Sequence, residues 1–181
     1  MEARQKAENL LGAAALAIQD AISAAFRSLD LKTNTDAAAL VLLKQSNKLS
    51  ISSMAVLLDL EHSSMVRAVD RLVSRRLVTR ESNPADARQA VLALTPAGGR
   101  LAERVLDVRG AALTRMLGAL RPEDISAITS LLSKILAKHT TSRQSADRLC
   151  RLCDEKSCGG DQCPVECAAL TQMMSGMPSE P

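Results

Sequence analysis

Apolar residues recur every three or four positions near the N-terminus of the chain, a spacing that predicts an amphipathic helix over residues 4–30. The residues of this stripe are Leu11, Ala15, Ile18, Ile22, Ala25 and Leu29. Such a stripe packs either against the protein's own core or against a helix of a second subunit. Because its small alanines permit close approach between helices, we expect this helix to form part of a dimer interface.

The middle of the chain changes its pattern several times in quick succession. Thr35 and Asp36 offer an N-cap for a helix that ends near Ser46. Residues 50–98 then follow the order helix, tight turn, helix, short apolar run, charged loop, short apolar run. This order predicts a helix-turn-helix followed by a β-hairpin wing, an arrangement that places one helix in a DNA groove.

Two more helices are predicted after the wing. Thr95 is the N-cap of the first, with Pro96 in its first position, and this helix ends near Leu120. Pro122 opens the second, which keeps the helical period to His139. Their apolar stripes consist of Leu101, Val105, Val108, Ala112, Met116 and Leu120 in the first helix and of Ile125, Ile128, Leu132, Ile135 and Leu136 in the second.

Together these elements predict a mainly α fold with a small β-hairpin wing, that is, a winged helix-turn-helix with N- and C-terminal dimerisation helices. The predicted parts are an N-terminal dimerisation helix (1–34), a winged helix-turn-helix DNA-binding domain (35–95), C-terminal dimerisation helices (96–139), a cysteine-rich metal-binding segment (140–170) and a disordered tail (171–181). A Thr-, Ser- and Gln-rich linker at 140–145 should separate the cysteine-rich segment from the last helix.

Composition agrees with a helical, basic body. The chain has 181 residues, and its only aromatic residue is a single Phe, so Leu, Ala, Val, Ile and Met must build the core. Residues 140–181 hold four Lys and Arg against six Asp and Glu, which leaves residues 1–139 with a net charge of +5 and suited to contact with phosphates. No segment reads as a membrane span or a signal peptide, so we expect a cytoplasmic protein without a membrane partner.

The second helix of the predicted helix-turn-helix has two distinct faces. Its apolar face consists of Met65, Ala68, Val69 and Leu72, and its polar face of Ser63, Arg67, Asp70, Arg71 and Ser74. Because Arg67 and Arg71 are four residues apart, we expect their guanidinium groups to project together. Arginine bonds guanine bidentately or clamps a phosphate. The alternative is a solvated basic face on an ordinary helix.

The wing adds two more candidate DNA contacts. Arg80 lies on its first strand and Arg88 near its tip, where Asn83 begins the turn. We expect Asp86 to orient the guanidinium of Arg88, which can then enter a minor groove, where the negative potential favours arginine. The alternative is a surface salt bridge of little energetic weight.

Several motifs between Leu49 and Leu120 point to one family. They are Ser63-Ser64-Met65-Val66-Arg67-Ala68-Val69-Asp70-Arg71-Leu72, Leu77-Val78, Asp86-Ala87-Arg88 and Leu94-Thr95-Pro96-Ala97-Gly98. With these motifs the chain resembles the MarR family of winged helix-turn-helix regulators over roughly residues 5–139. The pattern departs from the family at Glu61-His62, where a Ser or Thr cap is common, at Val66, where a polar residue is common, and at Asp59, where a turn Gly is frequent.

The resemblance implies a homodimer that binds a palindromic operator in double-stranded DNA and is released by a signal, and we expect it to act as a repressor. The DNA contacts that it implies are Ser63, Ser64, Arg67 and Arg71 from the helix and Arg88 from the wing. The family often binds small aromatic acids. Because only Phe26 could stack on such a ring, a small-molecule effector is not indicated here.

All five cysteines lie near the C-terminus. The candidate metal ligands are Cys150, Cys153, Cys158 and Cys163, with Cys167 as an alternative. In a reducing compartment such a cluster binds a metal or acts in redox chemistry more often than it forms structural disulfides. Three interpretations stay open, namely an iron–sulfur cluster, a zinc ion, and thiols that sense oxidants by forming disulfides.

Catalysis finds no support in the sequence, and we expect a protein that is not an enzyme. The chain has no phosphate-binding loop, no G-x-G-x-x-G, no H-E-x-x-H and no nucleophile elbow. His62 and His139 are its only histidines, and both suit helix ends better than general-base chemistry. The rival function is a thiol or iron–sulfur redox protein or metal-binding adaptor without DNA binding, which salt-dependent binding to the upstream DNA would distinguish.

Overall fold

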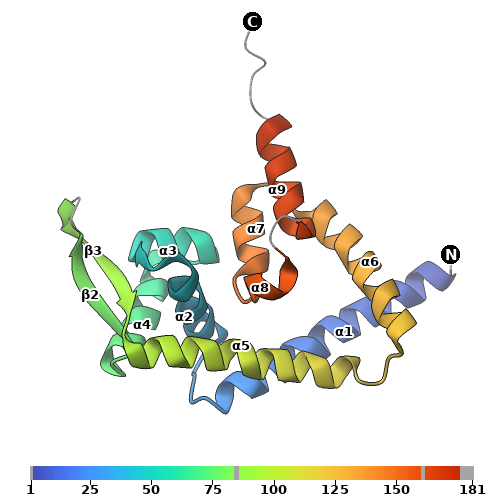
Figure 1. Ribbon diagram of the computed structural model, residues 1–181, viewed down its shortest axis with the longest axis horizontal. Helices are drawn as coiled ribbons and strands as arrows, with labels where there is room; N and C mark the ends of the chain where they lie inside the picture. Colours follow the sequence, from blue (N-terminus) through green and yellow to red (C-terminus); the bar gives the residue numbers. More distant parts are fainter. Residues whose placement is uncertain (1, 84–85, 160–161, 176–181) are drawn as a thin grey trace, which may run out of the picture.

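The computed structural model describes residues 2–83, 86–159 and 162–175 (Figure 1). Its helices are α1 (Glu2–Arg27), α2 (Asn34–Ser46), α3 (Ile51–Leu58), α4 (His62–Ser74), α5 (Pro96–Leu117), α6 (Pro122–His139), α7 (Arg143–Cys150), α8 (Glu155–Cys158) and α9 (Pro164–Ser175). Its strands are β1 (Lys48–Ser50), β2 (Val78–Asn83) and β3 (Asp86–Leu94). The predicted fold class, mainly helical with a small wing, is confirmed.

The long helix α5 is the axis of the molecule (Figure 1). Helices α2, α3 and α4 with the sheet form a helix-turn-helix lobe near the start of α5, α1 packs along α5, and α6 turns away from its other end. The last three helices, which we call the cysteine module (residues 143–175), lie between the lobe and α6 and pack against α3 and α6.

The core lies inside the lobe and where α1 and α5 meet it. Its largest fully buried side chains include Leu40, Met54, Met65 and Leu72, which come from α2, α3 and α4. Phe26, the single aromatic residue, is 1% exposed at the end of α1. Because it is committed to the core, it cannot stack on a ligand at the surface.

The sheet has the strand order β1-β3-β2 and is antiparallel throughout. Strands β2 and β3 form the predicted wing, with Val78 opposite Leu94. The third strand, β1, places Lys48 opposite Ala93 and was not predicted. Three residues are too few for a period-two pattern, so only the pairing with β3 reveals this strand.

Local capping rules explain several helix ends. The hydroxyl of Thr95 accepts a bond from the Gly98 amide at 3.0 Å, as expected for the start of α5. A Cβ on Gly98 would lie 1.9 Å from the carbonyl oxygen of Leu77, so only glycine lets α5 approach the turn before β2 this closely. Asp59 ends α3 in the left-handed conformation with φ 54°, where the family more often has glycine.

Other expected boundaries were wrong. The N-cap of α2 is Thr33, whose hydroxyl accepts from the Asp36 amide at 3.2 Å, so Thr35 and Asp36 lie inside the helix. The N-terminal helix ends at Arg27, three residues before the expected end at residue 30. Glu61, before α4, makes no side-chain capping bond, in agreement with the departure noted in the sequence.

The C-terminal segment is more ordered than the sequence suggested. The expected linker at 140–145 is short, because Thr140 is buried and Ser142 caps α7 through the amide of Ser145. Part of the expected disordered tail is helical, because α9 continues to Ser175. Residues 176–181 lie outside the described residues.

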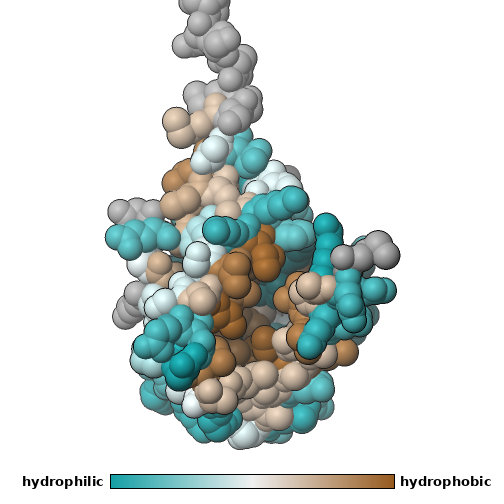
Figure 2. Space-filling model, turned by 90° about the vertical axis from the view of Figure 1, so that its right-hand side faces the viewer, coloured by the Kyte–Doolittle hydropathy of each residue, from teal (hydrophilic) through white to brown (hydrophobic). Residues whose placement is uncertain are grey.

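Apolar side chains remain exposed on the two arms of the molecule, α1 and α6. They include Leu10, Leu11 and Leu16 on α1 and Leu131, Leu132 and Ile135 on α6. No residue of α6, all of which is described, is buried. Figure 2 shows apolar surface gathered in a hollow on the side of the molecule where these arms lie. This surface lacks a covering partner within the described chain.

The expectation that no segment could span a membrane was too broad. By length and composition alone, α1 qualifies as a candidate span, and little of it is buried in the fold. The same test is passed by the apolar helices of soluble proteins. Here the C-terminal end of α1 packs on α5 and contributes Ile22 and Phe26 to the core.

Candidate nucleic-acid interface

Helix α4 presents a narrow polar edge to solvent, as predicted for a recognition helix. Met65, Ala68, Val69 and Leu72 are all buried against the lobe. On the opposite side Ser63 and Arg67 are exposed and Ser64 is half-buried. Arg67 Nη2 donates to the hydroxyl of Ser64 at 3.0 Å, a bond within one turn of the helix. The exposed guanidinium of Arg67 is therefore held beside the hydroxyl of Ser64.

The prediction that Arg67 and Arg71 project together is wrong. Arg71 turns toward α2, where its Nη2 lies 2.6 Å from Oδ1 of Asp36 and its Nε lies 3.3 Å from Oδ2. The Asp36 side chain is 3% exposed, and a buried carboxylate needs a cation with good hydrogen bonds. Arg71 thus holds the recognition helix against α2, and Arg67 is left as the outward-facing arginine of the predicted pair.

Asp36 was not among the candidate residues. A signal for it exists in the sequence, because this carboxylate directly precedes the apolar run Ala37–Leu43, every residue of which is buried. An acidic residue in such a context calls for a buried partner. The sequence could not identify Arg71 as that partner, because 35 positions separate the two.

Arg80 joins the wing to the recognition helix. Its Nη2 lies 2.6 Å from Oδ1 of Asp70, so strand β2 is tied to α4. Both side chains are about half exposed, and the pair therefore lies at the surface where the wing meets the helix. Asp70 would by itself repel phosphate, but its charge is offset by this contact. Arg80 therefore has a structural role in joining the wing to α4, and its contact with DNA stays a prediction.

The other end of the wing is described only by its backbone. Arg88 and Asp86 lie on β3, and Asp86 is opposite Asn83 in the register. The predicted contact between the two side chains, and the turn at Pro84, lie outside what the structure describes. The wing nevertheless extends from the base of α4 to beyond the lobe (Figure 1).

A second site lies in the cysteine module. Four cysteines interact with one another through their side chains, and we call them the thiol cluster: Cys150, Cys153, Cys158 and Cys163. Hydrogen bonds link the side chains in series, from Cys150 to Cys153, from Cys153 to Cys158 and from Cys158 to Cys163. Cys167, the predicted alternative, lies on α9 outside the lining of the cavity that the cluster shares.

The thiols differ in acidity because their surroundings differ. The hydrogen bond from Cys150 lowers the pKa of the Cys153 thiol to about 6, with a further contribution from the positive charge of Arg109. The same hydrogen bond raises the pKa of Cys150, since that thiol is the donor. Burial raises the pKa of Cys158. Cys153 is therefore the thiolate of the cluster near neutral pH.

The type of ligand in the thiol cluster suits a metal, but the arrangement of the thiols does not yet form a metal site. Four thiols within contact range are the ligand type that zinc and iron–sulfur clusters require. Within residues 2–83, 86–159 and 162–175, however, no three His, Cys, Asp or Glu side chains are arranged to hold a metal ion. Binding a metal would therefore require the four thiols to close around one point.

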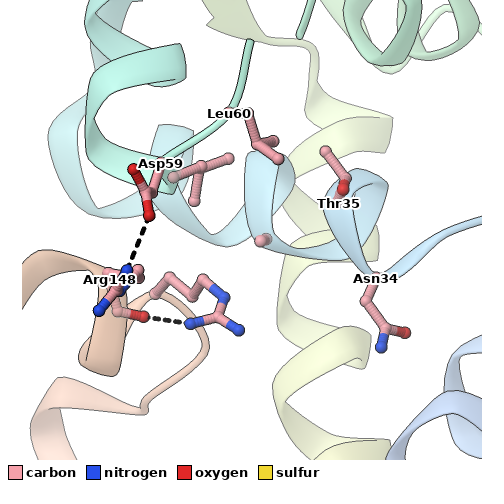
Figure 3. Close-up of a pocket in the computed structure, with 8 residues that line it drawn as sticks. Asn34, Thr35, Asp59, Leu60 and Arg148 are labelled. Carbon is pink, nitrogen blue, oxygen red and sulfur yellow. Dashed lines mark hydrogen bonds and ion pairs between the residues drawn. The ribbon is translucent and has the colours of Figure 1, made fainter. Parts of the chain in front are cut away.

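The cysteine module contacts the helix-turn-helix directly. Arg148 of α7 lies 2.7 Å from a carboxylate oxygen of Asp59, the residue that ends α3 (Figure 3). Arg151 lines the same pocket and donates to the carbonyl oxygen of Arg148. Gln45 of α2 donates to the carbonyl oxygen of Cys153 at 3.2 Å. The thiol cluster is thus tied to both helices that support the recognition helix.

The tri-helical lobe, the antiparallel wing and the exposed edge of α4 define a winged helix-turn-helix protein. A model of the MarR family matches residues 29–89, which include the turn and most of the wing. The repressor MdtR of Bacillus subtilis is 30% identical over 107 residues, which are 59% of this chain and 69% of that protein. The chain belongs to the MarR family, and it is a regulator rather than an enzyme.

Other relatives agree with this assignment. A putative transcriptional regulatory protein for the hcr operon of Thauera aromatica is 37% identical over 57 residues, 32% of this chain and 34% of that protein. The YusO protein of B. subtilis has a similar fold, with a TM-score of 0.66, 25% identity and coverage of 74% of this chain and 94% of its own. A mutant of MarR from E. coli in complex with operator DNA shares the fold at 21% identity, a TM-score of 0.58 and coverage of 71% and 92%.

Proposed function

We propose that the protein is a homodimeric, cytoplasmic repressor that binds a palindromic operator through α4 and the wing. The observation that carries the proposal is the division of work between neighbouring arginines. Arg71 and Arg80 brace α4 against α2 and the wing, and Arg67 stays exposed, bonded to Ser64. A braced helix with an outward-facing arginine suits readout of a major groove.

The contacts fall into two groups. Arg67 and Ser63 would meet base edges or phosphates from α4, with Ser64 orienting Arg67. Arg80 at the base of the wing and Arg88 near its tip would meet the backbone or the adjacent minor groove. Of the predicted DNA contacts, Arg71 has the weakest support, because its guanidinium is engaged with Asp36. The similarity to a MarR protein bound to operator DNA supports this placement of the helix and the wing.

The dimer is supported by apolar surface that the described part of the chain leaves uncovered. Leu16 on α1 is 70% exposed and Leu131 on α6 is 59% exposed. An apolar face of this extent marks an interaction surface in a soluble protein. Pairing of two copies through these arms would present two recognition helices to half-sites about 34–36 Å apart, one turn of B-DNA.

Repression is inferred from the relative named as a repressor and from the expected position of a bound dimer on its promoter. The rival function, a redox or metal-binding adaptor without DNA binding, is favoured by the thiol cluster alone. It leaves the exposed edge of α4 without a role. The two functions therefore differ in what they predict for Arg67.

The test is binding to a duplex of the protein's own upstream region against a shuffled duplex of equal length. The intact chain should prefer the upstream region, with an affinity that falls steeply with salt. Arg67→Ala should weaken binding by about tenfold or more. The matched control is Arg4→Ala, which removes the same charge from the exposed far end of α1 and should leave binding unchanged. Equal binding of both duplexes by the intact chain would refute the proposal.

A further inference from the structure

The cysteine module lies between the lobe and α6, the two parts whose relative position matters for a dimeric regulator. Helix α7 packs on α3, and α9 packs on α6 and on α7 (Figure 1). The module is thus a bridge between a DNA-binding lobe and an arm of the proposed dimer. A change in its shape would act on both.

The thiol cluster opens into a cavity of about 400 Å³ at this bridge. One wall of the cavity comes from the module, including all four thiols of the cluster. The other comes from the lobe, through Leu42 and Gln45 of α2 and Leu57 of α3. A ligand held by the thiols would therefore lie against the helix-turn-helix.

Charged side chains of both signs surround the cluster, and one of the cations, Arg109, acts on the thiols themselves. Four thiolates around a divalent zinc ion, or around an oxidised iron–sulfur cluster, carry a net charge of about −2. Arg143 and Arg151 line the cavity together with the carboxylates of Asp147, Glu155 and Glu166. Arg143 is already paired with Asp147 and Glu166, whereas the charge of Arg109 on α5 acts on Cys153 and Cys158. Arg109 would offset part of the charge of such a centre.

Arg109 gives a second, independent indication. Its Nε is a buried side-chain nitrogen with no hydrogen-bond partner among the described residues. Leaving a buried donor of a charged group unsatisfied is costly, so such an atom calls for a partner that is still to be identified. Sulfur atoms of a metal–thiolate centre accept hydrogen bonds and carry negative charge. Arg109 is placed to serve as the supporting donor beside the ligands.

We propose that the thiol cluster is a four-thiolate site for a thiophilic metal centre, either a zinc ion or an iron–sulfur cluster, whose occupancy regulates the helix-turn-helix. Because the four thiols come from the end of α7, the turn after it, the end of α8 and the residue before α9, ligation would fix these elements relative to one another. The proposal that the metal regulates DNA binding rests on the proposed function, whereas the proposal of a metal site is independent of it.

One route from the site to the lobe runs through the ion pair of Arg148 with Asp59. Arg148 is two residues before Cys150 on α7 and pairs with Asp59 at 2.7 Å (Figure 3). Asp59 lies in the left-handed conformation at the turn between α3 and α4. Movement at the end of α7 would therefore displace Asp59, and with it the turn that connects α3 to the recognition helix α4.

The metal site is tested by purifying the full chain without air from cells supplied with iron and zinc, and then measuring metal per chain and the visible spectrum. About one zinc and no colour, or about two to four iron atoms with sulfide and visible absorption, would support the proposal. The Cys153→Ser, Cys158→Ser double variant should lose the metal and stay helical by circular dichroism. Cys167→Ser is the matched control and should keep the metal.

Two outcomes would overturn the proposed metal site. One is a chain that holds no metal and takes up neither zinc nor a reconstituted cluster, and the other is a double variant that retains the same metal as the intact chain.

The regulatory half is tested by comparing operator affinity with and without the metal. Loading should change the affinity by about fivefold or more, the lower range of allosteric coupling. Asp59→Asn keeps a residue that tolerates the left-handed conformation and removes the charge facing Arg148, so it should reduce this change without altering metal content. Unchanged affinity in the loaded chain would overturn the regulation and leave the metal site standing. Failure to bind the operator in either form would instead refute the proposed function.

Discussion

Arg71 on α4 and Asp36 on α2 form a two-point ion pair inside the helix-turn-helix lobe, with distances of 2.6 and 3.3 Å. The carboxylate is almost completely buried, whereas Arg71 is one-third exposed. Arg67, one turn earlier on the same helix, is exposed and bonds only within its own helix in the contacts described. Two arginines that look equivalent in the sequence therefore have different roles.

Arg71→Ala should lower the free energy of unfolding by about 2–4 kcal/mol, because it leaves a buried carboxylate without its cation. Arg67→Ala should change it by less than about 0.5 kcal/mol, as expected of an exposed residue. Urea denaturation followed by circular dichroism measures both. Adding Asp36→Asn to Arg71→Ala should restore part of the loss. Equal stability of the two single variants would contradict the assignment.

Asp70→Asn should strengthen binding to DNA of any sequence. The substitution removes a carboxylate from the interface and leaves Arg80, now without its partner at 2.6 Å, to neutralise a phosphate. The slope of log affinity against log salt should steepen by about one. Stability should fall by no more than about 1 kcal/mol, because the pair is half exposed. Weaker binding would mean that the contact between wing and helix matters more than the charge.

Gly98→Ala should destabilise the protein by about 2 kcal/mol or more, since its Cβ would lie 1.9 Å from the Leu77 carbonyl oxygen and α5 would have to move. Gly99→Ala is the matched control. A Cβ there meets no atom within 4 Å, so the substitution should be neutral or stabilise the helix by about 0.5–1 kcal/mol. Thermal unfolding of both variants measures the two changes in stability, and equal melting temperatures of the two variants would contradict the prediction.

Leu132→Asp should convert the protein to a monomer and weaken operator binding. The residue is 43% exposed on α6, within the apolar surface assigned to the dimer, and a buried unpaired carboxylate is costly. Leu170→Asp, at 49% exposure on α9, is the control and should remain dimeric. Light scattering coupled to size-exclusion chromatography gives the mass of each. If the Leu132→Asp variant remains dimeric, the dimer interface does not include this part of α6.

Alkylation should identify Cys153 as the most reactive thiol of the reduced, chelator-treated chain. Because the pKa of Cys153 is lowered to about 6, its reaction rate should rise as pH increases through about 6, well below the range of an ordinary thiol. Cys150→Ala removes the main cause of the shift and should move this rise to higher pH. Iodoacetamide labelling followed by peptide mass spectrometry gives the rate at each cysteine. A rise near pH 8–9 at Cys153 would contradict the arrangement.

Much of the fold was predictable because its signals are local. The apolar period of α4, the Thr95 cap with Pro96 and the start of α6 at Pro122 depend on residues within a few positions of one another. Such rules hold wherever the segment lies in the protein. The predicted boundary was wrong where two nearby residues could each act as the N-cap, as Thr33 and Thr35 could before α2.

The sequence by itself determined the order of helices, the two-faced recognition helix and the clustering of cysteines near the C-terminus. Only the tertiary structure decided that Arg71 faces Asp36, that Arg80 pairs with Asp70 and that Arg109 of α5 lies near the thiols. The direction of a long charged side chain depends on which partner the packing brings within reach. That partner comes from a different element, so periodicity and capping carry no information about it.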